Sequence, residues 1–161
     1  LTAVGTHDLP PTAGYLKGAH NQLRHDLGLV AESLDELNAN DAVWISQVLA
    51  RAQAEGAFAA SALAEIDFTD YDLGEYGHTD ELLVGLTRFI ASTPSAMTCT
   101  NLVDMVGDER IQNQPGTNAE QYPNWCIPLC DAAGNAILLD ELAGVELFRQ
   151  MAAASRRSHL A

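Results

Sequence analysis

Residues 79–100, with the sequence TDELLVGLTRFIASTPSAMTCT, carry a helix signal followed by a strand signal. Thr79 is suited to an N-cap, and acidic residues follow it in the first turn. An apolar stripe at helical spacing runs behind them through Leu82, Leu83, Leu86, Phe89 and Ile90. The segment therefore predicts a helix over 79–91, closed by Thr93-Pro94-Ser95, and a short buried strand over 95–100.

The rest of the chain predicts more helix and one other strand. Residues 1–6 predict a short buried strand, and Pro10 and Pro11 suit the first positions of a helix that runs to about residue 27. Further helical segments are expected over 33–55, over the alanine-rich residues 56–66, over 102–105 and over 140–155. A long loop is expected over 107–134. The predicted fold class is mainly α with two short strands.

Charge and length limit the function. The chain has 161 residues and a formal net charge of −14, from 22 Asp and Glu against 8 Lys and Arg. One domain of this size buries a core without disulfides or metal ions. Because there is no basic cluster, neither nucleic acid nor a membrane surface is expected as a partner.

The cysteine content predicts a cellular compartment, and the first residue predicts a fragment. Three cysteines make an odd number, which argues against a secreted disulfide framework and favours the cytoplasm. No apolar run approaches the ~18 residues that a membrane span needs. The first residue is Leu1 instead of Met, and the strand signal begins at once, so we expect a fragment of a longer protein.

For several groups of residues, a structural role is favoured over a functional one. His20 and His25 are five apart on a predicted helix and are expected to be solvated. Cys126 and Cys130 lack a second ligand pair for zinc and are expected to be packed thiols. The acidic residues of 67–75 lack the EF-hand pattern and predict a solvated loop. Trp125 is either a sugar platform or a core anchor, and composition favours the anchor. No metal and no cofactor is expected.

Two polar motifs follow the predicted strands. Thr6-His7-Asp8 comes where the first strand ends, and strand ends are where many α/β enzymes hold their functional residues. The turn Asn113-Gln114-Pro115-Gly116-Thr117 comes after the second strand. Its rigid Pro-Gly pair could aim Asn113 toward the end of the molecule that carries Asp8. Each motif alone is also typical of an ordinary turn.

Taken together, three motifs resemble a known family. They are Thr6-His7-Asp8-Leu9-Pro10-Pro11-Thr12-Ala13-Gly14-Tyr15, Asn113-Gln114-Pro115-Gly116-Thr117 and Tyr122-Pro123-Asn124-Trp125. In this order they resemble the C-terminal part of the 4-alpha-glucanotransferases, also called amylomaltases or disproportionating enzymes. The resemblance covers almost the whole chain.

The resemblance implies a retaining transferase of alpha-1,4-glucans on a (β/α)8 barrel, with no cofactor. Asp8 matches the carboxylate that stabilises the transition state, and His7, Asn113 and Gly116 match substrate-contacting positions. The nucleophile and the acid/base belong to earlier strands in that family, so the isolated chain is expected to be inactive.

The resemblance also implies an organisation and partners. Residues 1–161 would form the last two β/α units of the barrel, with a helical insertion over about 30–78. The expected partners are maltooligosaccharides, the rest of the barrel and, for the isolated fragment, a second copy of itself. The alternative is a non-catalytic helical domain that binds carbohydrate or protein.

Overall fold

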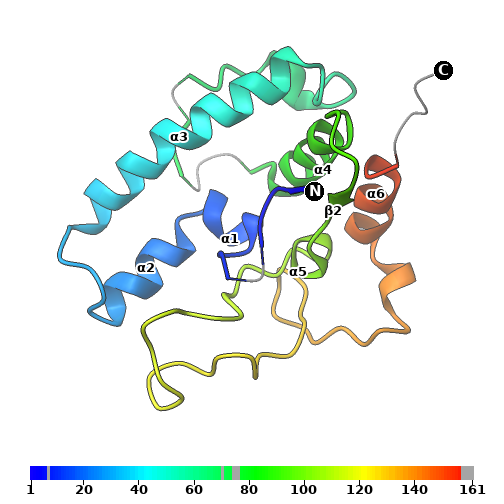
Figure 1. Ribbon diagram of the computed structural model, residues 1–161. Coiled ribbons are helices and arrows are strands. Elements are labelled where there is room, and N and C mark those ends of the chain that lie inside the picture. The colour runs from blue at the N-terminus through cyan, green and yellow to red at the C-terminus, as the bar shows by residue number, and fades with distance from the viewer. Residues whose placement is uncertain (7, 70, 74–76, 157–161) are drawn as a thin grey trace.

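The computed structural model describes residues 1–6, 8–69, 71–73 and 77–156. Its helices surround one pair of short strands, and the long loop after α5 runs along one side of the molecule (Figure 1). The elements in chain order are β1 (Thr2–Ala3), α1 (Thr12–Leu16), α2 (Ala19–Asp26), α3 (Leu34–Ala54), η1 (Ala62–Glu65), α4 (Thr79–Ala91), β2 (Thr98–Cys99), α5 (Leu102–Met105), η2 (Leu142–Gly144) and α6 (Glu146–Ala154). The prediction of a mainly helical chain with two short strands is confirmed.

The two strands pair in parallel, with Thr2 opposite Thr98 and Ala3 opposite Cys99. Both are shorter than the predicted ranges 1–6 and 95–100. The prediction that they are buried is wrong, since Thr2, Ala3 and Thr98 are half-buried and Cys99 is exposed. Within the described residues the sheet has these two strands alone, so no third strand covers their outer edges.

Helix α4 confirms the helix predicted over 79–91 and lies at the centre of the packing. Leu82 and Leu86 enter a cluster with α1, α3 and the segment 57–71, while Leu83 enters a second cluster with α6. The residue at the N-cap is His78, and Thr79 is already helical, one position from the prediction. The apolar stripe of α4 therefore packs into both hydrophobic clusters.

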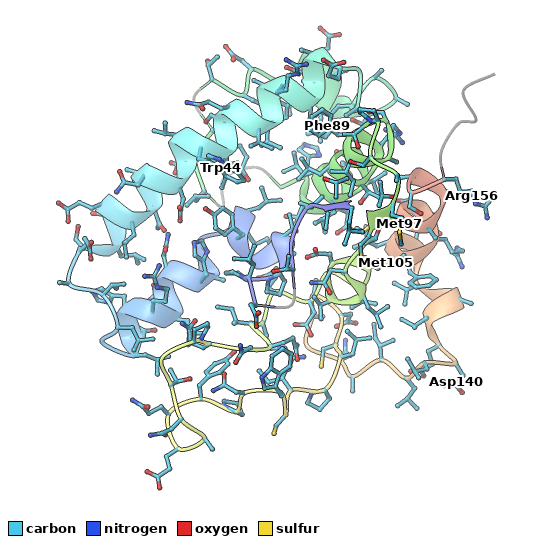
Figure 2. All side chains as sticks on the ribbon, viewed as in Figure 1. Trp44, Phe89, Met97, Met105, Asp140 and Arg156 are labelled. Atoms are coloured by element: carbon cyan, nitrogen blue, oxygen red, sulfur yellow. The ribbon has the colours of Figure 1, made fainter. Side chains whose placement is uncertain are left out.

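Helix α3 confirms the prediction over 33–55. Ser33 and Glu36 form a reciprocal capping box that satisfies backbone groups at its start. Trp44 lies on the side of α3 that faces α1 (Figure 2), with its ring edge toward the Tyr15 ring at a centroid distance of 6.1 Å. Through this contact α3 packs against α1, the helix that follows β1.

Three predicted helices have different limits in the structure. The helix expected from Pro10 to residue 27 is two helices, because Gly18 has φ of +72°, a left-handed conformation that ends α1. Residues 56–66 form turns and the short η1 instead of a regular helix. The helix expected over 140–155 is η2 followed by α6, since Val145 between them is extended, with ψ of 122°.

The loop predicted over 107–134 is confirmed as a segment without regular helix, which ends in a single antiparallel bridge between Cys130 and Ala136. Buried polar groups hold it in place. Asp108 is 1% exposed and accepts hydrogen bonds from the Arg110 side chain and from the backbone amide of Cys130. Across the described ranges, no helix is long and apolar enough to cross a membrane.

Candidate functional site

The structure brings together the two polar residues that were predicted to follow the strands. Asn113 donates a hydrogen bond from Nδ2 to Oδ1 of Asp8, with an N···O distance of 3.1 Å across 105 residues of sequence. Asp8 is exposed, and Asn113 is half-buried. Asp8 follows β1, and Asn113 follows β2 after α5; the hydrogen bond brings Asn113 to the side of the strand pair that carries Asp8.

The Tyr122-Pro123-Asn124-Trp125 segment holds the turn that carries Asn113. The Asn124 side chain accepts a hydrogen bond from the amide of Gln114 at 2.7 Å and donates one to Oγ1 of Thr117 at 2.9 Å. Tyr122 donates from its hydroxyl to the carbonyl of Ile111 at 2.6 Å. The segment 122–125 therefore supports the turn from behind, which fixes the direction of Asn113.

Asp8 and Asn113 line a cavity of about 450 Å³ that reaches to α2 and α3. Its volume falls in the range of small-molecule sites. The far wall is polar, with Arg24 of α2 and Asn40 of α3 among the lining side chains. A cavity with a carboxylate, amides and a guanidinium around it suits a ligand with several hydroxyl groups.

A hydrogen-bonded network centred on Asp41 stiffens that wall. Its carboxylate accepts from the Tyr15 hydroxyl at 2.9 Å, from Nε2 of His20 at 2.8 Å and from Nδ2 of Asn21 at 2.7 Å. The Tyr15 and His20 rings stack with centroids 4.3 Å apart. The network joins α1, α2 and α3 beside the cavity.

These contacts set the protonation states in the wall. Burial lowers the pKa of His20 more than the hydrogen bond to Asp41 raises it, so the imidazole is neutral at pH 7. Partial burial opposes ionisation of Asp41, but the hydrogen bonds from Asn21, Tyr15 and His20 outweigh it and lower the pKa of Asp41. The wall therefore carries the negative charge of Asp41 together with the positive charge of Arg24.

The other predicted substrate-contacting residues are less informative. His7 lies outside the described residues. Gly116 is exposed at the tip of the turn, with φ of +84°, and is not among the residues that line the cavity. Its role in the structure is to allow the turn that follows Asn113.

Several structural expectations need correction. His20 is 5% exposed and part of the Asp41 network, so the prediction of a solvated residue is wrong, while His25 is exposed as predicted. Cys130 is buried as predicted, but Cys126 is exposed. Trp125 is 59% exposed, so the core-anchor interpretation is wrong, and its φ of +61° is rare for a large side chain.

The acidic segment fits its prediction where it is described. Asp67 and Asp72 are exposed, whereas Asp70 and Glu75 lie outside the described residues. Among the residues that the structure describes, no group of three or more potential ligands gathers around a metal-sized site.

Sequence reasoning missed the Asp41 network and a buried carboxylate, Asp104. Asp41 and His20 lie on separate amphipathic helices, and nothing in their spacing signals contact. Asp104 did have a signal, because it lies in the apolar run 102–106, where a buried charge requires partners.

In this structure an acid and an amide that follow two parallel strands are in contact. Such an arrangement is typical of α/β proteins that bind small polar ligands at the carboxyl ends of their strands. A sequence model of the 4-alpha-glucanotransferase family matches residues 1–132, and the chain belongs to that family. The resemblance seen in the three motifs is thereby confirmed.

Individual relatives agree. The chain is 37% identical over 146 residues to 4-alpha-glucanotransferases of Mycobacterium tuberculosis and Mycobacterium bovis, which covers 88% of this chain and 18% of each relative. Its fold matches the crystal structure of amylomaltase from Corynebacterium glutamicum with a TM-score of 0.86 and 46% identity, over 98% of this chain and 22% of that chain. The chain thus spans less than a quarter of the length of these proteins.

Proposed function

We propose that the chain forms the last two β/α units of a (β/α)8-barrel 4-alpha-glucanotransferase, with residues 30–78 as a helical insertion. The 46% identity to part of an amylomaltase supports this proposal, as does the long helical crossover between two parallel strands. The observation that carries it is the hydrogen bond between Asn113 and Asp8 at the carboxyl edge of the strands.

In this proposal Asp8 acts on the transition state of a retaining glucan transfer. Cleavage of a glycosidic bond develops positive charge on the sugar ring, and a fixed carboxylate favours that charge over the neutral ground state. Asn113 donates a hydrogen bond to Oδ1 of this carboxylate and so helps to fix its direction. The nucleophile and the acid/base come from the part of the enzyme outside this chain.

The substrates follow from the same chemistry. Maltooligosaccharides and other alpha-1,4-glucans serve as donor and as acceptor, and the second glucan takes the place of water. His7 and Gly116 keep the substrate-contacting roles that the family motif implies. No cofactor is needed, because two carboxylates and a glucosyl-enzyme intermediate suffice for the reaction.

The rest of the barrel is the first partner of this chain. Apolar side chains at the strand pair and in the loop before η2 are exposed, among them Leu1, Val4, Met97, Leu138 and Leu139. Burying them against further barrel strands and helices removes this apolar surface from water. The isolated chain would bury it by self-association. The three free cysteines fit the cytoplasm as the site of action.

The test is disproportionation of maltotriose by the complete polypeptide that contains this chain. The Asp8→Asn variant keeps the shape of the side chain and loses its charge, so we expect kcat to fall by about 10²–10³-fold with a much smaller change in KM. Asp140→Asn, an exposed acid in the loop before η2 (Figure 2), is the matched control and should retain wild-type kcat.

Three outcomes would contradict the proposal. A rise in KM at unchanged kcat for Asp8→Asn would make Asp8 a simple binding residue. Enzyme-like production of glucose and longer glucans by the 161-residue chain alone would show that the assumed nucleophile and acid/base are not required from elsewhere. Tight maltooligosaccharide binding without any transfer by the complete polypeptide would favour the non-catalytic binding domain instead.

A further inference from the structure

A buried carboxylate joins the two segments that carry Asp8 and Asn113. Asp104, at 3% exposure, lies in α5 directly after β2. Its Oδ1 accepts a hydrogen bond from the backbone amide of Thr12 at 2.6 Å, and its Oδ2 accepts one from the Thr12 hydroxyl at 2.9 Å. These two residues are 92 positions apart in sequence.

The contact supplies the cap of a helix that has none of its own. Thr12 begins α1, and the residue at the N-cap, Pro11, makes no side-chain capping hydrogen bond. Amides in the first turn of a helix need an acceptor, and a carboxylate is a strong one. Asp104 provides it from the other β/α unit, so the start of α1 is fixed to α5.

The contact between α1 and the segment after β2 continues to Glu109, five residues beyond Asp104. A β-carbon built on Gly14 of α1 would lie 2.3 Å from the carbonyl oxygen of Glu109, so the two backbones are in direct contact. Lys17 then pairs with Glu109 at 2.5 Å. Helix α1 is therefore held along its length by residues 104–109.

The contact between α1 and residues 104–109 lies four residues from Asp8 on one side and from Asn113 on the other. Asp8 comes four residues before Thr12, and Asn113 comes four residues after Glu109. The link from Asp8 to Thr12 contains Pro10 and Pro11, which restrict the backbone. A shift of α1 against α5 therefore moves Asp8 relative to Asn113.

We propose that Asp104 is a positioning residue, which sets the place of Asp8 in the active site by fixing the start of α1 to α5. The proposal rests on the transferase function proposed above. The contact is closed to water, since Asp104 is 3% exposed, and this burial raises the pKa of Asp104 despite the hydrogen bonds from Thr12. A displacement of about 1 Å at a reacting centre can cost 10²-fold in rate.

The experiment compares four variants of the complete polypeptide in maltotriose disproportionation. Asp104→Ala removes both acceptors, so we expect kcat to fall about 10–100-fold while KM changes by less than about threefold. Asp104→Asn keeps an acceptor oxygen for the Thr12 amide and gains a donor for the Thr12 hydroxyl, so it should restore most of kcat. Thr12→Val should fall between them, and Thr12→Ser should match the wild type.

A control separates positioning from loss of stability. Gln53 donates hydrogen bonds to the carbonyls of Leu63, Ala64 and Ile66, and it anchors η1 away from Asp8. Gln53→Ala should lower the unfolding midpoint and leave kcat unchanged per folded enzyme. If Asp104→Ala behaves like Gln53→Ala, with normal kcat and lower stability, the positioning role is refuted. If Asp104→Ala does not fold, kcat of Thr12→Val equal to that of Thr12→Ser refutes it.

Failure of the underlying function gives a different result. If Asp8→Asn transfers glucan as fast as the wild type, the proposed role of Asp8 is wrong whatever Asp104 does. If Asp8→Asn is impaired and the Asp104 and Thr12 variants have wild-type kcat, the function stands and the positioning role alone is overturned.

Discussion

Replacing Asp41 with Ala should cost the protein a measurable part of its stability. The carboxylate accepts hydrogen bonds from the Tyr15 hydroxyl, from Nε2 of His20 and from Nδ2 of Asn21, at 2.7–2.9 Å. His20 is 5% exposed and Asn21 is 1% exposed, so water cannot readily replace the lost acceptor at these two side chains. The substitution therefore leaves buried donors without a full set of partners.

The magnitude follows from the number of buried donors. Each donor left unsatisfied costs about 1–3 kcal/mol, and Asn21 keeps a second acceptor in Asn38, so we expect a loss of about 2–4 kcal/mol. Asp41→Asn retains one acceptor oxygen and should lose about 1 kcal/mol. Asn40→Ala, at the neighbouring exposed position of α3, is the matched control.

Acid should weaken the same network. The pKa of His20 is lowered in the folded protein, so the unfolded chain binds a proton first as the pH falls below about 6.5, and unfolding becomes easier. The pKa of Asp41 is lowered too, so its contribution is lost only at a pH below about 3.9. The wild type should therefore lose stability between pH 7 and pH 5, and His20→Gln should lose less over the same interval.

Urea unfolding followed by far-UV circular dichroism measures both effects. A change of less than about 0.5 kcal/mol for Asp41→Ala, the range of ordinary surface substitutions, would refute the reasoning. So would a His20→Gln variant with the same pH dependence as the wild type.

Two further predictions concern packing. Gly85→Ala should destabilise the protein by about 1–3 kcal/mol in thermal unfolding, although alanine favours helix, because the new β-carbon would lie 2.0 Å from the Phe58 ring. Cys99 and Cys126 are exposed and should react at once with a thiol reagent, whereas Cys130 is buried and should react only after unfolding; equal rates for all three would contradict the structure.

The sequence predicted only that Asn113 is aimed toward the end of the molecule that carries Asp8, because both motifs follow a predicted strand, and not the hydrogen bond between them. It could not predict the contact between His20 and Asp41. Their helices approach each other through a tertiary arrangement that depends on the left-handed turn at Gly18, where a side chain would meet Asn38. Periodicity shows one helix at a time and carries no information on the angle between two.

The same limit explains the broken helix at 140–155. Its apolar residues have helical spacing, but the extended Val145 separates η2 from α6. Leu147 and Met151 are buried in the cluster around Leu83, and the half-buried Val145 packs against it. Spacing predicted the core positions of Leu147 and Met151 and missed where the backbone turns.

The parallel pairing of β1 with β2 has a consequence for synthesis on the ribosome. Thr2 is made before Thr98, so the pairing of β1 with β2 must wait for residue 98, and the contact of Asp8 with Asn113 must wait for residue 113. The cluster of α1, α3 and α4 is complete in sequence by Leu86, so it can collapse while β2 is still absent. Contacts between residues so far apart along the chain form slowly. The edge that carries Asp8 and Asn113 is therefore among the last parts of this segment to be assembled, on helices whose residues are already made.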